Sequence, residues 1–237
     1  MSWQAHIITL MPDAFPGLLG QSLNGRALEK KLWSLHITAL RDFGDGKHLN
    51  VDDTPAGGGA GMVLRADVAG AALDHVRGQA PDLPIIVPSP RGVQFTQSRA
   101  KELANSGGAI FFCPRFEGLD ERVFAHYPIE EVSLGDYILS GGDLAAQIMI
   151  DASLRLLPGV MGDMASAEEE SFENDLLEYP HYTRPSEWRG LEIPEVLTSG
   201  DHQKTAAWRR AQAEKLTQTR RPDLWQRYLA AQKPKKD

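Results

Sequence analysis

The chain has 237 residues, of which 42% are hydrophobic and 24% are charged, and its formal net charge is −7. This composition excludes a wholly disordered chain, a collagen and a coiled coil, and it suffices for one large domain or two smaller ones. No apolar run approaches the ~20 residues that cross a bilayer, and the first ten residues lack a basic leader, so we expect neither a membrane span nor a signal peptide.

Short runs rich in Ile, Val and Phe alternate with helical patterns through the first 160 residues. We expect strands at 6–11, 35–40, 84–88, 109–113 and 131–139, and helices at 67–76, 97–104 and 143–157. This alternation predicts an α/β fold with a mostly parallel sheet. Ligands of such sheets bind where the strands end and the loops begin.

The pattern changes beyond residue 160. Pro158-Gly159 ends the last of these helices, and residues 161–178 are acidic without apolar periodicity. Helices are expected at 206–218 and at 222–232, the second with Pro222 in its first turn. The sequence therefore predicts a first domain at 1–160, an acidic flexible linker at 161–178 and a small helical domain at 179–237.

Charge is segregated along the chain. Residues 201–237 contain ten Lys and Arg against four Asp and Glu, a balance of +6, which leaves −13 for residues 1–200. Residues 163–178 contain seven acidic residues and no basic one. An acidic body with a basic C-terminal module able to bind a polyanion fits this distribution, and so does a solvated helix face.

Glycine-bearing turns follow several of the expected strands. The run 56–62 has neither the Lys and Ser/Thr of a P-loop nor the spacing of a dinucleotide fingerprint. The turns at 89–92, 115–118 and 140–143 each come directly after an expected strand, and Asp143 is placed to cap the following helix. Three such turns predict one small-molecule site built largely from backbone groups.

In order and spacing, seven stretches resemble the bacterial tRNA (guanine-N1)-methyltransferases of the TrmD type, which belong to the SPOUT class of transferases. The resemblance runs from the N-terminus to about residue 210, and the combination of these stretches is highly specific. These stretches are 51–55, 57–62, 89–92, 115–122, 134–142, 155–160 and 180–185.

The resemblance implies a trefoil-knotted SPOUT domain followed by a small α-helical domain. It implies a tRNA-modifying enzyme that transfers a methyl group from S-adenosylmethionine to N1 of guanine 37, beside the anticodon, when position 36 is also guanine. It further implies a homodimer that shares each site between two subunits, and a divalent cation, expected to be Mg²⁺, for which the sequence shows no dedicated ligand cluster. The single cysteine, Cys113, excludes an intramolecular disulfide and fits a cytoplasmic protein.

The reaction needs a base aimed at the N1 proton and a group that holds the charge developing on O6. The family places its base in an Asp before a Ser-Phe pair, and the matching residue before Ser171-Phe172 is Glu170. Glu169 is the register-shifted alternative, and a merely solvated linker is the other. Arg155 matches the arginine that orients the base and stabilises charge on O6, a task that suits a planar, permanently charged guanidinium.

The resemblance also assigns a cofactor pocket with a dry slot for the adenine. Pro114 stands where the family usually has glycine, and it lacks a backbone N–H. The assigned residues are Pro88, Ser89, Pro90 and Gly92 in one loop, Pro114, Phe116, Glu117 and Gly118 in the next, and Leu134, Gly135, Asp136, Tyr137, Ile138, Leu139, Gly141 and Gly142 in the last.

For the tRNA, the resemblance points to residues in both halves of the chain. Glu117 matches a glutamate that contacts the region of the target guanine, and the basic C-terminal module supplies arginines for phosphate contacts. The full set is Asp52, Gly59, Glu117, His181, Arg184, Arg209 and Arg210.

Two alternatives remain on the sequence alone. One is another knotted methyltransferase, acting on ribosomal RNA or on a different tRNA atom. The other is a non-catalytic RNA-binding paralogue, of which Glu170 and Pro114 would be the signs. A Rossmann dehydrogenase or a P-loop NTPase is disfavoured because neither motif is present.

Overall fold

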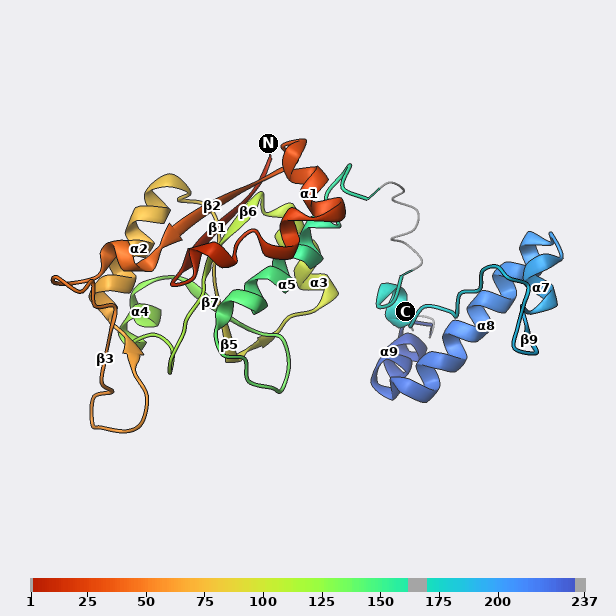
Figure 1. Ribbon diagram of the computed structural model, residues 1–237. Helices are drawn as coiled ribbons and strands as arrows, with labels where there is room; N and C mark the ends of the chain where they lie inside the picture. The colour runs from red at the N-terminus through yellow and green to blue at the C-terminus, as the bar shows by residue number, and fades with distance from the viewer. Residues whose placement is uncertain (1, 162–169, 233–237) are drawn as a thin grey trace, which may run out of the picture. The chain divides into compact units, whose positions relative to one another are not determined.

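The computed structural model describes residues 2–161 and 170–232. The chain divides into two compact units, residues 1–162 and residues 163–237 (Figure 1). Within the described ranges, no helix combines the length and the apolar character that crossing a bilayer requires.

The first unit contains a five-stranded parallel sheet. Its strands are β1 (Trp3–Thr9), β2 (Trp33–Ala39), β5 (Ile85–Gln94), β6 (Gly108–Phe112) and β7 (Ile129–Ser133), in the order β2-β1-β6-β5-β7. Every neighbouring pair is parallel, which confirms the predicted α/β class. All five expected strands are present at about the expected places.

The end of β7 differs from the prediction. The strand ends at Ser133, and the apolar run from Tyr137 to Leu139 belongs to the loop that follows. Tyr137 is 55% exposed and Ile138 is 78% exposed. An apolar strand pattern assumes that its side chains fill a core, and these side chains do not.

Helices cover both faces of the sheet. The expected helices appear as α2 (Ala66–Gln79), α3 (Gln97–Asn105) and α5 (Gly142–Leu154), whereas α1 (Ser22–Glu29) and α4 (Glu121–His126) were not expected. Short 3₁₀ turns lie at η1 (Pro12–Ala14), η2 (Gly17–Gly20) and η3 (Leu40–Phe43). Helices α1, α3 and α5 share one core cluster with Ile7, and α2 and α4 share the other with Ile8. This division follows from the period of two along β1.

Two irregular features of the backbone interrupt the regular strands and loops of this unit. Strands β3 (Asp52–Asp53) and β4 (Val63–Leu64) form a small antiparallel pair joined by the glycine-rich loop 54–62. In β5 the register against β7 shifts between Pro88 and Val93, so residues 89–92 leave the regular ladder. A Cβ at Gly92 would lie 2.3 Å from backbone atoms of Glu131 and Val132, which explains the glycine there.

The second unit is mostly helical. Its elements are η4 (Glu173–Asp175), β8 (Glu187–Trp188), β9 (Leu191–Glu192), α7 (Glu195–Thr198), α8 (His202–Arg220) and α9 (Pro222–Gln232). The two expected helices lie within α8 and α9. Helix α8 begins earlier than expected because the Asp201 carboxylate accepts from the N–H groups of Gln203 and Lys204.

The described part of the acidic segment is attached to these helices. The N–H of Leu177 donates to Thr217 Oγ1 of α8 at 2.8 Å, and Arg227 of α9 forms an ion pair with Asp175 at 2.9 Å. The N–H of Glu178 donates to Ser171 Oγ at 3.0 Å. Residues 162–169, the rest of the expected linker, lie outside the described residues.

Candidate functional site

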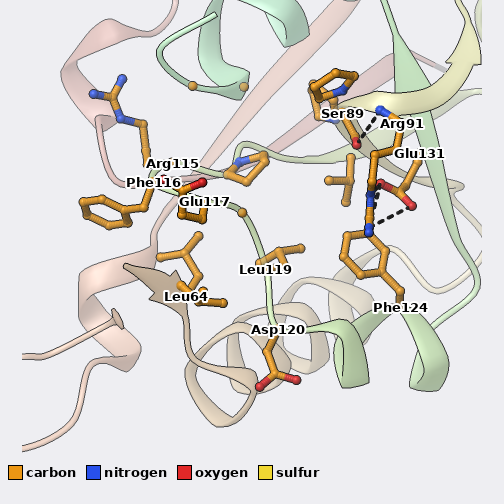
Figure 2. Close-up of a pocket in the computed structure, with 18 of the residues that line it drawn as sticks. Leu64, Ser89, Arg91, Arg115, Phe116, Glu117, Leu119, Asp120, Phe124 and Glu131 are labelled. Carbon is orange, nitrogen blue, oxygen red and sulfur yellow. Dashed lines mark hydrogen bonds and ion pairs between the residues drawn. The ribbon is translucent and has the colours of Figure 1, made fainter. Parts of the chain in front are cut away.

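A cavity of about 1350 Å³ lies in the first unit (Figure 2). It is formed by the irregular part of β5, the segment after β6 and the segment after β7, together with parts of β3, β4 and their flanking loops. Residues of all three glycine-bearing segments therefore line one cavity, although residues 89–92 lie inside β5 and do not follow a strand as expected.

Most of the residues that the sequence assigned to a cofactor lie in this lining. The exceptions are Gly92, which packs against the backbone of β7, and Asp136, which is exposed on the last loop. The assigned residues that line the cavity are Pro88, Ser89, Pro90, Pro114, Phe116, Glu117, Gly118, Leu134, Gly135, Tyr137, Ile138, Leu139, Gly141 and Gly142.

Two walls of the cavity are held together at Gly141 and Gly142. The N–H of Gly142 donates to the carbonyl oxygen of Pro114 at 2.8 Å. A Cβ at Gly141 would lie 2.5 Å from Arg115 Cδ, and a Cβ at Gly142 would lie 2.7 Å from Pro114 Cδ. Any larger residue would push the loops apart. Pro114, although it lacks an N–H, thus contributes its carbonyl and its ring to the junction.

Arg91 joins three walls of the cavity, and the sequence analysis did not single it out. Its guanidinium bonds to Glu131 of β7 at 3.1–3.2 Å and lies 5.4 Å from the ring centre of Phe124 (Figure 2). It also bonds to Glu121 of α4 at 3.1 Å. Hydrogen bonds to Glu121 and Glu131 raise the pKa of Arg91. Because 30 and 40 residues separate these partners, no local pattern could have indicated the contact.

The loop between β3 and β4 forms the wall beside Glu117. The N–H of Glu117 donates to the carbonyl of Met62 at 2.9 Å, and the N–H of Leu64 donates to the carbonyl of Gly118 at 2.9 Å. Asp52 and Gly59 do not line the cavity. Asp52 pairs with Leu64 in the ladder, and a Cβ at Gly59 would meet no atom within 4 Å.

Two groups near the cavity, Asp120 and Cys113, have pKa values far from their ordinary ones. Arg122 holds the pKa of Asp120, the N-cap of α4, at about 2. Behind the wall, Asp143 is 6% exposed and accepts from Thr9 Oγ1 at 2.5 Å, and its Oδ2 has no hydrogen-bond partner among the described residues. Burial and the neighbouring Asp143 raise the pKa of the Cys113 thiol, so this cysteine is not a nucleophile at neutral pH.

The second unit brings Glu170 together with Arg209 and Arg210. These three residues line a smaller cavity of about 310 Å³ with His202 of α8. The guanidinium of Arg209 lies 4.7 Å from the ring centre of Tyr179.

Other assigned residues lie outside this smaller cavity. The Nε2 of His181 lies 2.7 Å from Oε1 of Glu178, and Arg184 is exposed. Arg155, the C-cap of α5 in the first unit, lines neither cavity.

No metal site is visible in the described ranges, which contain no group of three or more His, Cys, Asp or Glu able to hold an ion. The acidic residues 163, 168 and 169 lie outside those ranges. The described residues therefore do not support a Mg²⁺ site, and no chemical step is assigned to one.

Comparison with known proteins gives a consistent result. A family model described as tRNA (Guanine-1)-methyltransferase TrmD matches residues 3–227. A protein of Ruegeria pomeroyi is 61% identical over 96% of this chain and 94% of its own length, and one of Bartonella bacilliformis is 60% identical over 96% and 97%. A protein of Zymomonas mobilis is 58% identical over 97% and 92%. All three are named tRNA (guanine-N(1)-)-methyltransferase.

Proposed function

Since the chain belongs to the TrmD family of tRNA (guanine-1)-methyltransferases, we propose that it transfers the methyl group of S-adenosylmethionine to N1 of guanine 37 in tRNAs that also have guanine at position 36. The observation that carries the proposal is the cavity on which the irregular part of β5 and the segments after β6 and β7 converge. We also propose that the protein acts in the cytoplasm, where tRNA is available.

The cavity fits the proposed cofactor. Its volume of about 1350 Å³ exceeds the ~300–1,000 Å³ typical of small-molecule sites. Gly118 has φ +105°, and a Cβ there would meet no atom within 4 Å, so the backbone is open to a ligand. S-adenosylmethionine, when bound, supplies a methyl group activated on a sulfonium. The turns would hold its polar groups through backbone atoms, and the apolar side chains of the last loop would exclude water.

The remaining chemistry belongs to side chains of this chain. In the proposal, Glu170 accepts the proton of guanine N1, which makes that nitrogen a nucleophile. Arg155 stabilises the negative charge that develops on O6, and Glu117 contacts the target guanine from the cavity wall. Glu170 lines the smaller cavity of the second unit together with Arg209 and Arg210, and this shared lining supports a role of Glu170 beside the bound tRNA.

We also propose a trefoil-knotted fold and a homodimer. The close passage of Gly141 and Gly142 against Pro114 supports a chain threaded tightly at this point. On α5, Leu144 is 62% exposed and Ile148 is 51% exposed, four residues apart on one helix face. Leu18 on η2, which packs against α5, is 83% exposed. Such apolar residues on adjacent elements favour association with a second copy.

The tRNA would be positioned by the second unit. Arg184, Arg209, Arg210 and His181 are the proposed phosphate contacts, and the cavity of the first unit would receive the flipped-out guanine. The excess of positive charge at 201–237 supports the assignment of phosphate binding to the second unit.

The test is methyl transfer from labelled S-adenosylmethionine to a tRNA with guanine at 36 and 37, against the same tRNA with guanine 36 replaced. We expect transfer to the first tRNA alone, mapped to N1 of guanine 37, with parallel reactions in Mg²⁺ and in chelator. Methylation of another atom or of ribosomal RNA would favour a different knotted methyltransferase. Absence of transfer by folded protein that binds tRNA would favour the non-catalytic paralogue.

A further inference from the structure

The glycine-rich loop 54–62 contains one glycine that differs from its neighbours. Gly57, Gly58, Gly59 and Gly61 all have positive φ, but a Cβ at the first three would meet no atom within 4 Å. A Cβ at Gly61 would lie 2.4 Å from Oε1, 2.7 Å from Cγ and 2.9 Å from Cδ of Glu117. The side chain of Glu117 therefore occupies the space that a side chain at position 61 would need.

The backbones on either side of this contact are fixed to one another. The carbonyl of Met62 accepts from Glu117 N, the carbonyl of Gly118 accepts from Leu64 N, and the carbonyl of Leu64 accepts from Asp120 N at 3.0 Å. Leu64 and Leu119 also form a parallel bridge. The loop end cannot move away from residues 117–119 without losing these bonds, so a side chain at position 61 would displace Glu117 itself.

The carboxylate of Glu117 depends on this packing for its direction. Among the described residues, no donor bonds its oxygens, and Figure 2 shows it on the cavity wall beside Arg115 and Phe116. A glutamate without such a bond normally samples several rotamers. Here the backbone of Gly61 forms a floor under the side chain and restricts that choice.

We infer that Gly61 is a positioning residue, whose missing side chain leaves the space that the Glu117 side chain occupies on the cavity wall. The inference rests on the proposed function, in which Glu117 contacts the target guanine. It assigns the loop 54–62 a role in catalysis that is exerted through Glu117 and not by contact with the cofactor.

Gly61→Ala and Gly57→Ala form a matched pair for the test. Their φ values, +88° and +91°, impose nearly the same strain on alanine, but only the alanine at 61 meets Glu117. The measurements are kcat and KM for tRNA, the dissociation constant of S-adenosylmethionine by calorimetry, and the melting temperature.

We expect Gly61→Ala to lower kcat by ~100-fold relative to Gly57→Ala, the loss that a displacement of about 1 Å causes at a reacting centre. The cofactor affinity should stay within about twofold, and the collision should lower the melting temperature more in Gly61→Ala than in Gly57→Ala. In a Glu117→Ala background, Gly61→Ala should cost no more melting temperature than Gly57→Ala does, because the colliding group is gone.

Equal kcat values for the two variants, with an active wild type, would overturn the inference. A parallel loss of cofactor affinity in Gly61→Ala would also overturn it, because a collapsed cavity and not a moved carboxylate would then explain the result. An inactive wild type would instead contradict the proposed function, and the melting temperatures would still decide whether Gly61 and Glu117 collide.

Discussion

Among single residues, Glu170 has the most specific proposed role, because it would accept the proton of guanine N1. Glu170→Gln keeps the shape of the side chain and removes its ability to take a proton. We expect methyl transfer to fall by at least ~100-fold, within the range that positioned bases contribute, while calorimetry shows unchanged binding of S-adenosylmethionine. Glu170→Asp should retain activity, since the carboxylate remains.

Glu169→Gln is the matched control for this prediction, as it removes a neighbouring carboxylate from the same acidic run. It should be close to wild type in methyl transfer. If Glu170→Gln is active and Glu169→Gln is not, the base belongs to position 169. If both are active, a bound water takes the proton.

His6 gives the first unit a pH dependence. Its ring is stacked on that of His36 at 4.4 Å, and burial, followed by the charge of His36, lowers the pKa of His6 from 6.5 to about 4. Between those values the unfolded chain binds a proton that the folded chain does not. This contribution to the free energy of unfolding is therefore complete above pH 6.5 and is lost as the pH falls toward 4, by up to about 3 kcal/mol.

Urea unfolding at pH 7.5, 6.0 and 4.5 measures this loss. The comparison with His6→Phe isolates it from the other histidines, because phenylalanine keeps a ring on His36 and cannot be protonated. The variant should show a flatter decline than the wild type. Identical pH slopes would mean that His6 titrates normally in the folded protein.

At the scale of elements, Gly92 shows how a strand irregularity shapes the cavity. The resemblance assigned Gly92 to the cofactor, which stays a prediction, and in the structure Gly92 packs against the backbone of β7 and does not line the cavity. Gly92→Ala should lower the free energy of unfolding by about 1–3 kcal/mol, the usual range for overpacking. It should also move the neighbouring Arg91 away from Glu131 and weaken cofactor binding.

Gly78→Ala in α2 is the control for Gly92→Ala. A Cβ at Gly78 meets nothing within 4 Å, so this change should raise the free energy of unfolding by about 0.5–1 kcal/mol through helix propensity. Urea titration of both variants tests the pair. A Gly92→Ala variant as stable as the wild type would mean that β5 and β7 can separate at little cost.

The elements also show what the sequence could predict. Short runs rich in Ile, Val and Phe located all five sheet strands, because a strand buried on both faces carries a nearly continuous apolar run. Helix α1 was missed because Asn24 and Gly25 are weak helix formers, yet a Cβ at Gly25 would lie 2.3 Å from the carbonyl oxygen of Gly20. A tertiary contact, which local pattern cannot reveal, requires that glycine.

In the candidate site, too, the sequence predicted what depends on local pattern and missed what depends on contacts between distant residues. Each cavity turn carried a local glycine signal, so most of the lining was predictable. The contact of Arg91 with Glu131 and the packing of Gly61 on Glu117 join residues 40 and 56 positions apart. Such pairs follow from the strand order, which the alternation of strands and helices does not specify.

Along the full chain, the separation of charge predicts that the basic C-terminal segment binds the tRNA phosphates. Replacing both Arg209 and Arg210 by Gln should weaken tRNA binding and lower the slope of log K against log [salt] by ~1–2. Filter binding from 50 to 200 mM salt measures both effects. Affinity and slope equal to wild type would exclude these two side chains from the phosphate contacts.

A control is needed because Arg210 also has structural partners. Its guanidinium bonds to Glu214 at 3.1 Å and to the hydroxyl of Tyr228 at 2.8 Å, which joins α8 to α9. Arg210→Lys keeps the charge and loses this fork. If the lysine variant binds tRNA like the wild type, the loss in the glutamine variants is electrostatic and not a consequence of loosened helices.

The strand order also determines when the protein can complete its sheet during synthesis. Strand β1 lies between β2 and β6, and β6 follows β1 by about 100 residues. At about 5–20 residues per second, the ribosome delivers β6 roughly 5–20 s after β1. It must then enter between β1 and β5, both already made. The nascent chain therefore spends seconds with unpaired strand edges, and its yield in the cell depends on what shields those edges in that interval.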